Sequence, residues 1–306
     1  PLFFSLSFFF LSLPPPPSFF FFFFFFFLFF LPPPPFLFFL LNKKKDVMGP
    51  FVGFRTSRDG GQTWDEPRVR LRARDDTLFG EYAVTGSRAH KVKFGAPHVV
   101  DFGRNLAHTP DGKAYVVAHG SRRNTNGTRL TWMSGDDVYV ARAAPDAATI
   151  NDGGAWEFFG GQAGGQAVWV RGNVTAAQPV FSWLNRTGVV TMTYAAALQR
   201  YLTVVSTPSV YGGSTLEQYD TYVLESATPT GPDFALVAYL RAFGPEAYFV
   251  NIPTKFADPA VRPDGTWEFY LSYSANFACR DCGRPDPPDA AYAWVLQRAR
   301  LRVNNN

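Results

Sequence analysis

Several carboxylates of this chain stand in or beside apolar segments, where burying an unpaired charge costs free energy. Two carboxyl groups held close together can serve as an acid and a base, so such residues can do chemistry. In the alternative interpretation each carboxylate caps a turn or pairs with a nearby arginine, namely Arg104, Arg142, Arg186 or Arg241. The candidates are Asp101, Asp136 or Asp137, Asp220, Glu225 and Glu246, of which we predict catalytic roles for Asp101, Asp136, Asp220 and Glu246.

Two of these carboxylates have informative surroundings. Glu246 lies in FGPEAYFVN, after a turn and before a strand whose Tyr248 and Asn251 could bind hydroxyl groups, so we predict that Glu246 is the acid. Asp101 lies in PHVVDFGRN, and we predict that it is the base. Side chains alternate along a strand, so His98 and Asp101 share a site only if the strand ends before Asp101. The glycine at position 103 favours such an end.

Three of the four histidines, His98, His108 and His119, lack the short spacing of common metal motifs, although a fold can still bring them together. A neutral histidine can instead hydrogen-bond a ligand hydroxyl, or fill a place in the core or in a turn. We therefore predict no metal ion and no cofactor. The residues predicted to bind a ligand are His98, Arg104, His119, Arg186, Tyr194, Tyr248 and Asn251.

The elements that must position these side chains are short strands. Segments rich in β-branched and aromatic residues recur, separated by Gly, Pro, Asn and Asp, which predicts an antiparallel all-β fold such as a sandwich, barrel or propeller. Pairs such as Asp111-Gly112 and Asp264-Gly265 predict hairpin turns. The predicted strands are Phe51–Arg55, Ala114–His119, Asp137–Arg142, Ala167–Arg171, Val189–Tyr194, Tyr201–Ser206, Thr221–Glu225, Ala235–Leu240, Tyr248–Ile252, Thr266–Ser272 and Ala291–Gln297.

The segment from Gly188 to Leu240 contains four consecutive predicted strands joined by three hairpin-like connections. Four such strands make one blade of a β-propeller, and the segment has roughly the 40–50 residues that a blade needs. The rest of the chain divides into three or four comparable pieces. We therefore predict a five-bladed β-propeller of four-stranded antiparallel blades.

The stretch SRDGGQTW, residues 57–64, fits the pattern Ser/Thr-x-Asp-x-Gly-x-x-Trp. The side chains of Ser57 and Asp59 can bind the turn backbone, while Gly61 can take positive φ and the tryptophan can cover the turn. The pattern resembles the Asp-box repeat of sialidases and related propellers, where it lies away from the active site, so we predict a structural role. A second stretch, NDGGAW at 151–156, is one residue short of the spacing.

A longer resemblance covers about residues 50–300. The series KFGAPHVVDFGRNLAHTPDGKAYVVAHG, SGDDVYVAR, NRTGVVTMTYAAALQRYL, YDTYVLESATPTGP and FGPEAYFVNIP is similar to an uncharacterised group of five-bladed propellers related to glycosidases such as arabinanases and invertases. The resemblance implies three carboxylates around a funnel, two of them flanking the scissile bond at roughly 5–5.5 Å apart for retention or 6.5–9.5 Å for inversion. It therefore implies a glycoside hydrolase-like protein that acts on or binds an oligo- or polysaccharide.

Two other functions remain open from the sequence. The related enzymes usually carry an aromatic residue directly after the Gly231-Pro232 pair, and here Asp233 precedes Phe234. A carbohydrate-binding propeller without catalysis is therefore one alternative, and a scaffold for protein partners is another. The tryptophans that could stack on sugar rings, or pack between blades, are Trp132, Trp169 and Trp183.

Residues 1–41 contain only Pro, Leu, Phe and Ser, as a translated pyrimidine tract would. The longest apolar run, Phe19–Leu31, has 13 residues, fewer than the roughly 20 of a membrane helix, and no basic region precedes it as in a secretory signal. We predict that residues 1–42 are a low-complexity segment outside the fold, most simply a gene-model artefact, with an uncleaved anchor as the alternative. Residues 43–306 are predicted to form the propeller.

The formal net charge of +4 arises from Lys and Arg scattered among Asp and Glu, without a long basic block, which argues against nucleic acid as a partner. Cys279 and Cys282 lack the second pair of a zinc ribbon, so we expect a local disulfide or two thiols. Sequons at Asn126, Asn173 and Asn185 are compatible with secretion. We find no firm sign of a membrane partner and predict a monomer.

Overall fold

The computed structural model is all-β: its sheets are antiparallel, and the described ranges contain short 3₁₀ turns but no α-helix. The predicted all-β class is therefore confirmed. No helix within these ranges is long and apolar enough to cross a membrane. The structure describes residues 53–57, 59, 61–64, 77–81, 92–121, 135–147, 149–209, 219–244, 247–276 and 292–303.

The first sheet has six strands: β1 (Gly95–Val99), β2 (Ala114–Gly120), β3 (Asp137–Ala143), β4 (Glu157–Ala163), β5 (Gln166–Arg171) and β6 (Phe181–Ser182). Strands β2 and β3 pair along their whole length, and β1 pairs with the other edge of β2. The outer position beside β3 is shared, because β4 pairs with one end of β3 and β6 with the other. Between β4 and β6 the chain leaves the edge of β3, and β5 pairs antiparallel with β4; we call this segment, from β4 to β6, the excursion. Because the outer position is divided in this way, the first sheet has six strands, whereas four strands were predicted for each blade.

The second sheet has four strands: β7 (Val189–Ala195), β8 (Arg200–Pro208), β9 (Tyr219–Ser226) and β10 (Ala235–Leu240). Each strand pairs antiparallel with the next, in the order β10-β9-β8-β7, which confirms the four-stranded unit predicted for this segment. Strand β8 is buried along nearly its whole length, as its run of Val and Thr favours. Strand β10 carries a bulge between Leu236 and Ala238.

The third sheet has three strands in the described ranges: β11 (Tyr248–Asn251), β12 (Thr266–Asn276) and β13 (Tyr292–Arg302), in the order β11-β12-β13. Side chains alternate along β12, so that Trp267 and Phe269 are buried on the face toward the second sheet. Strands β12 and β13 pair in register over their full length. This long hairpin therefore presents one apolar face to the core, and the opposite face of β12 carries polar residues such as Glu268 and Ser272.

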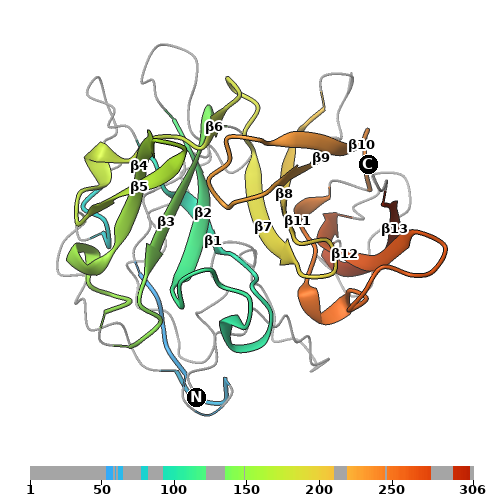
Figure 1. Ribbon diagram of the computed structural model, residues 1–306, viewed down its shortest axis with the longest axis horizontal. Coiled ribbons are helices and arrows are strands. Elements are labelled where there is room, and N and C mark those ends of the chain that lie inside the picture. The colour runs from blue at the N-terminus through green and yellow to red at the C-terminus, as the bar shows by residue number, and fades with distance from the viewer. Residues whose placement is uncertain are drawn as a thin grey trace, which may run out of the picture.

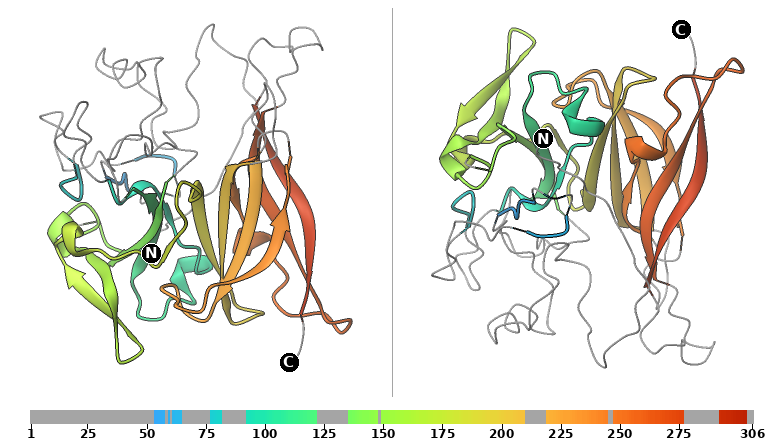
Figure 2. Two further views of the ribbon diagram at one scale, coloured as in Figure 1. Left: turned by 90° about the horizontal axis from the view of Figure 1, so that it is seen from above. Right: turned by 90° about the horizontal axis from the view of Figure 1, so that it is seen from below.

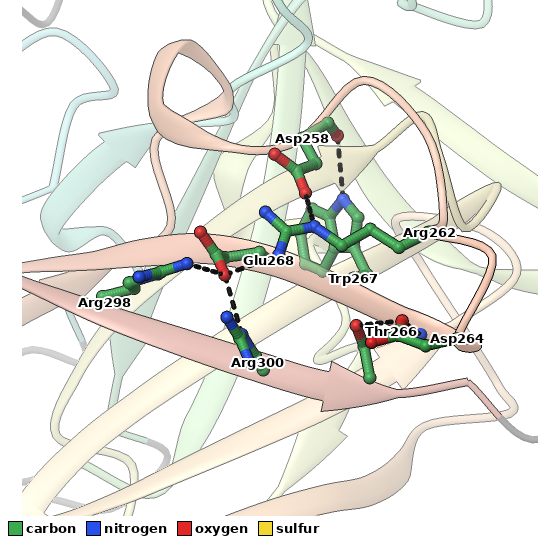
Figure 3. Close-up of polar contacts among 8 residues, drawn as sticks. All are labelled: Asp258, Arg262, Asp264, Thr266, Trp267, Glu268, Arg298 and Arg300. Carbon is green, nitrogen blue, oxygen red and sulfur yellow. Dashed lines mark hydrogen bonds and ion pairs between the residues drawn. The ribbon is translucent and has the colours of Figure 1, made fainter.

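Glu268 lies near the start of β12, opposite Arg300 of β13 (Figure 3). Its Oε2 accepts hydrogen bonds from Arg298 Nη2 at 2.6 Å and Arg300 Nε at 2.7 Å, and Arg262 Nη1 lies 3.0 Å away. Arg262 Nε also donates to Asp258 Oδ2 at 2.7 Å. These hydrogen bonds, with that from Arg298 the largest contribution, lower the pKa of Glu268 to about 2. The cluster ties the β12–β13 hairpin to the loop that precedes β12.

The three sheets follow one another across the molecule, as the change from green through yellow to red shows (Figure 1, Figure 2). The first sheet packs on the second through completely buried residues such as Val117, Val140 and Val190. The opposite face of the second sheet packs on the third through Leu202 and Trp267, among others. Each sheet therefore buries a face against its neighbour in the chain.

The strands β1, β7 and β11 lie at the side where the three sheets meet. Asp101, just after β1, and Thr193 of β7 form a parallel bridge. The hydroxyls of Thr191 and Thr193 donate to the backbone oxygens of Val250 and Ile252, at 2.7 and 2.8 Å respectively. We call β1, β7 and β11 the inner strands. The described residues form three sheets, and the five-blade count stays a prediction.

The turn SRDGGQTW has the hydrogen bonds expected from its sequence. Gly61 N donates to Ser57 Oγ at 2.7 Å, and Thr63 N donates to Asp59 Oδ1 at 2.9 Å. Gly61 has a φ of 93°, and Trp64 Nε1 donates to the backbone oxygen of Gly61 at 3.1 Å. The side-chain hydrogen bond from Thr63, followed by its backbone bond, lowers the pKa of Asp59 to about 2. The turn therefore satisfies its polar groups locally.

The shorter stretch at 151–156 packs against the chain just before that turn. Asn151 Nδ2 donates to the backbone oxygen of Phe54, and Phe54 N donates to Asn151 Oδ1, both at 2.7 Å. Trp156 is completely buried and stacks on Phe54, with ring centroids 5.7 Å apart. The stretch at 151–156 is thereby joined to the segment that precedes the SRDGGQTW turn, across 97 positions of the chain.

Candidate functional site

Asp101, the predicted base, lies beyond the end of β1, as the glycine at 103 indicates. Both of its carboxylate oxygens accept hydrogen bonds: Thr254 N donates to Oδ2 and Thr254 Oγ1 to Oδ1, each at 2.8 Å. Gly103 N donates to Oδ1 at 2.9 Å. The carboxylate therefore joins the end of β1 to the 3₁₀ turn η5 (Thr254–Phe256), which follows β11.

Asp136 and Asp137 lie at the opposite end of the first sheet. Asp136 is buried, and it accepts hydrogen bonds from Asn185 N at 3.0 Å and from Ser121 Oγ at 3.1 Å. Adjacent residues of a strand point to opposite faces, and Asp137 Oδ2 accepts a hydrogen bond from Tyr139 OH at 3.1 Å. Both carboxylates thus take part in hydrogen bonds within the fold.

The separation of Asp101 and Asp136 follows from the register of β2. Val100 N donates to the backbone oxygen of Tyr115 at 2.9 Å, and Asp136 N to that of Gly120 at 2.8 Å. Tyr115 and Gly120 are five positions apart on β2, which corresponds to about 17 Å along an extended strand. A glycosidase pair needs at most roughly 9.5 Å. The structure does not bring these two predicted catalytic residues together.

The remaining predicted carboxylates are Asp220, Glu225 and Glu246. Asp220 is buried at the start of β9, where it accepts hydrogen bonds from Ala242 N at 2.9 Å and Tyr239 OH at 3.1 Å. It therefore caps the end of the β9–β10 hairpin. Glu225 is half-buried on β9. Glu246, the predicted acid, lies outside the described residues, and its role stays a prediction.

His98 of β1 and His119 of β2 are close enough to interact electrostatically. His119 is completely buried, and the ring centroid of His98 lies 5.3 Å from that of Phe249 on β11. Desolvation, with a smaller contribution from His119, lowers the pKa of His98 to about 4, so this imidazole is neutral near pH 7. Across the described ranges, no group of three or more His, Cys, Asp or Glu side chains could hold a metal ion.

The predicted ligand-binding arginines lie in separate loops. Arg104 is exposed in the 3₁₀ turn η2 (Arg104–Leu106). Arg186 is half-buried, and its Nη1 donates to the backbone oxygen of Pro208 at 3.0 Å. Neither arginine forms an ion pair with another described residue, so the expected pairing with a carboxylate is not seen for them.

The other predicted ligand-binding residues lie on inner strands. Tyr194 of β7 packs on Tyr201 of β8, with ring centroids 5.0 Å apart. Asn251 Oδ1 accepts a hydrogen bond from Ile252 N at 2.8 Å. Tyr248 begins β11, and its side chain lies outside what the structure describes. Tyr194 and Asn251 make contacts within the fold, and the binding role of all three residues stays a prediction.

A cleft of about 280 Å³ lies between the first sheet and the connector from β9 to β10. One wall is formed by Tyr115 at the start of β2, Arg142 near the end of β3 and Trp169 on β5. The tip of the β4–β5 hairpin and the connector supply the other walls. The remaining lining residues are Pro110, Gln162, Gly165, Gln166, Ala167, Thr228, Pro229, Thr230 and Gly231.

Arg142 is held from several sides in this cleft. Its guanidinium carbon lies 3.9 Å from the ring centroid of Trp169. Its Nε donates to Glu157 Oε2 at 2.6 Å, and its Nη1 donates to Asp111 Oδ2 at 2.9 Å. Nη1 also donates to Tyr115 OH at 3.3 Å. A planar cation that stacks on an indole and binds two carboxylates is fixed in position.

The charges around Arg142 compensate one another. Lys113 Nζ binds the same Glu157 Oε2 at 2.7 Å. Desolvation acts to raise the pKa of Glu157, but hydrogen bonds from Lys113 and Arg142 outweigh it, so this pKa lies below its usual value. A general acid needs a raised pKa, which makes Glu157 unsuited to that role. Burial raises the pKa of Tyr115 to about 12, so its hydroxyl stays protonated.

Sequence reasoning did not find this cleft. The sequence indicated Arg142 only as a partner for a carboxylate, and Trp169 only as one of three tryptophans that could stack on a ring. The signal that could have found it is the cross-strand pair Arg142 and Glu157, which are opposite each other on β3 and β4. That signal depends on recognising β4, whose two glycines make it a weak strand by composition.

Comparisons with known proteins do not establish a family. No protein-family model matches the chain, and no curated protein shows a significant match, so the resemblance to Asp-box proteins gains no support from them. One solved structure, titled "Crystal Structure of Exo-1,5-alpha-L-arabinanase from Bovine Ruminal Metagenomic Library", is similar over 85% of this chain and 92% of its own, at 14% identity and a TM-score of 0.31. Because a TM-score this low does not establish a shared fold, no residue role is transferred from that enzyme.

Proposed function

We propose that this protein binds a carbohydrate in the cleft between the first sheet and the β9–β10 connector. The observation that carries the proposal is the fixed guanidinium of Arg142, which lies over Trp169 and bonds Tyr115. Sugars combine hydroxyl groups with apolar ring faces, and aromatic and polar walls match both. The cleft measures about 280 Å³, near the lower limit of roughly 300 Å³ for ligand sites, so it suits one sugar residue, free or within a longer chain.

Binding without hydrolysis agrees best with the described carboxylates. Asp101, Asp136 and Asp220 each accept at least two hydrogen bonds from within the fold. Beside the cleft, the carboxylates of Asp111 and Glu157 are bound by Arg142. A hydrolytic pair would have to include a residue outside the described ranges, such as Glu246. Hydrolysis is therefore the alternative that the experiment below measures in parallel.

We also propose that the three sheets are blades of a propeller. The inner strands of successive sheets lie side by side, and the second sheet is a four-stranded meander, as in a blade. Five blades would require two more sheets from residues 43–94, which is roughly the length of one blade. An experimental structure with four blades would correct the count but keep the propeller. One with only two face-to-face sheets would overturn it.

The binding proposal is tested by titrating the full chain with arabinan, xylan, fructan and sialoside oligosaccharides in a calorimeter. Trp169→Ala should abolish or strongly weaken binding, because it removes the ring beneath Arg142. Trp183→Ala is the matched control: this half-buried tryptophan packs on Tyr222, outside the cleft, and binding should persist. Reducing-end release measured on the same samples detects hydrolysis. Binding that survives Trp169→Ala, or the absence of binding to every glycan, would contradict the proposal.

A further inference from the structure

The charge balance of the cleft restricts its ligand. Among the residues that the structure describes, Arg142 is the one charged residue that lines it. Its guanidinium is neutralised by Asp111 at 2.9 Å and Glu157 at 2.6 Å, and Glu157 also holds Lys113 at 2.7 Å. Two cations therefore face two carboxylates, and the group as a whole carries no net charge.

An acidic ligand would meet this group unfavourably. To reach the guanidinium, a ligand carboxylate would have to displace Asp111 or Glu157, or else lie beside both of them and be repelled. The pKa of Glu157 lies below its usual value, so this carboxylate keeps its charge at neutral pH. An uncharged hydroxyl meets no such repulsion, and it can bond to the polar groups that line the cleft.

The uncharged polar groups of the cleft include two amides at the tip of the β4–β5 hairpin. Gln162 pairs with Ala167 and Ala163 with Gln166, so Gln166 directly follows the turn formed by Gly164 and Gly165, and Gln162 lies two positions before that turn. Among the described residues, no hydrogen bond involves the side-chain amide of either glutamine, and both side chains are exposed. An amide offers one acceptor and two donor hydrogens, which match a hydroxyl that both donates and accepts.

We infer that the ligand of this cleft is an uncharged sugar, selected against uronic and sialic acids by the compensated Arg142 and bound through the amides of Gln162 and Gln166. The inference rests on the proposed carbohydrate binding. The amides stand on the excursion that interrupts the outer strand of the first sheet. This hairpin would therefore determine which sugar is accepted, while the charged group is held by Arg142 of β3, Glu157 of β4 and the turn before β2.

The test compares neutral arabino- and xylo-oligosaccharides with oligogalacturonides of equal length, by calorimetric titration of the full chain. The native protein should bind a neutral oligosaccharide at least roughly tenfold more tightly than the acidic one, with little dependence on salt. Gln166→Ala should weaken neutral binding several-fold. Glu157→Gln leaves Arg142 and Lys113 undercompensated, so it should narrow the preference by increasing the affinity for oligogalacturonide. Asp111→Asn should shift the preference the same way, and circular dichroism checks the fold of each variant.

The outcomes separate this inference from the binding proposal. Oligogalacturonide binding that equals or exceeds neutral binding in the native protein would overturn the inference and leave carbohydrate binding intact. The inference would also be overturned if Glu157→Gln and Asp111→Asn both fold and both keep the native preference for neutral over acidic oligosaccharides. If no glycan binds, the proposed function fails and the inference fails with it. A neutral preference that narrows in either folded variant supports the inference.

Discussion

Thr254 N donates a hydrogen bond to Asp101 Oδ2 at 2.8 Å, although the two residues are 153 positions apart in the chain. The backbone of Asp101 is itself bound to β7, since Asp101 N donates to Met192 O at 3.0 Å and Tyr194 N donates to Asp101 O at 2.8 Å. This aspartate therefore connects the ends of all three inner strands. Its position explains why a carboxylate follows an apolar strand without any catalytic requirement.

Asp101→Ala should lower the free energy of unfolding by roughly 2–4 kcal/mol, because it leaves several hydrogen-bond donors without their acceptor. Urea unfolding of the native protein and the variant measures this difference. Asp152→Ala is the matched control, since among the described residues the Asp152 side chain accepts a hydrogen bond from the nearby Gly154 N alone, in an exposed turn. In a double-mutant cycle with Thr254→Val, the double variant should lose less unfolding free energy than the sum of the losses in the two single variants. Fully additive losses would contradict the proposed link.

Glu268→Gln should reduce stability in a pH-dependent way. The pKa of Glu268 in the folded protein is about 2, below its ordinary value of 4.5, so the stabilisation is present above about pH 4.5 and is lost as the pH falls toward 2. Thermal unfolding of the variant and the native protein should differ near neutral pH and converge at low pH. The matched control is Glu225→Gln, a half-buried glutamate on a strand outside the cluster. A difference that stays constant with pH would contradict the role of the three arginines (Figure 3).

Asn151→Ala should release the chain around Phe54 from the body of the first sheet. The variant loses both hydrogen bonds between the Asn151 amide and the Phe54 backbone, at a cost of roughly 1–3 kcal/mol. Hydrogen exchange at the Phe54 amide should therefore become faster. Asn173→Ala serves as the comparison, because among the described residues Thr175 alone donates hydrogen bonds to the Asn173 side chain. Equal exchange rates in both variants would refute the predicted attachment.

Leu236→Lys should reduce concentration-dependent association of the protein. Strand β10 is an edge of the second sheet, has no charged residue, and exposes 57% of Leu236. Uncharged edge strands favour pairing with other chains, and a lysine opposes it. Light scattering at increasing concentration measures the effect. Leu184→Lys changes an equally apolar residue, 63% exposed, that is not in a strand, and it should have a smaller effect.

The sequence predicted the parts of the fold that depend on local patterns. Strands β7 to β10 are rich in β-branched and aromatic residues and follow one another along the chain, so each strand and its partner could be recognised together. Strand β1 has the sequence GAPHV and β4 has EFFGGQA, in which glycine and proline hide the strand pattern. These two strands form because β2 and β3 offer them edges to pair with. Such tertiary pairing is invisible to a local pattern.

The candidate site was predicted less well, because burial shows that a carboxylate needs a partner but not which partner it has. For Asp101, Asp136 and Asp220 the donors include backbone N–H groups that are 153, 49 and 22 positions away. These hydrogen bonds fit the alternative in which the residues cap turns and strand ends, and their catalytic role stays a prediction. Arg142 does pair with carboxylates, but with Asp111 and Glu157, which no apolar segment marked as candidates.

Because β4 and β6 share the outer position beside β3, the residues between these two strands can be exchanged without removing a strand that β3 needs as a partner. Strand β3 remains paired on both sides of the excursion, at Ala141 and Arg142 by β4 and at Asp137 and Val138 by β6. Hairpins of other lengths or compositions could therefore be grafted between these anchor points while the sheet keeps its register. A library of such grafts would offer a route to new ligand preferences on an unchanged scaffold.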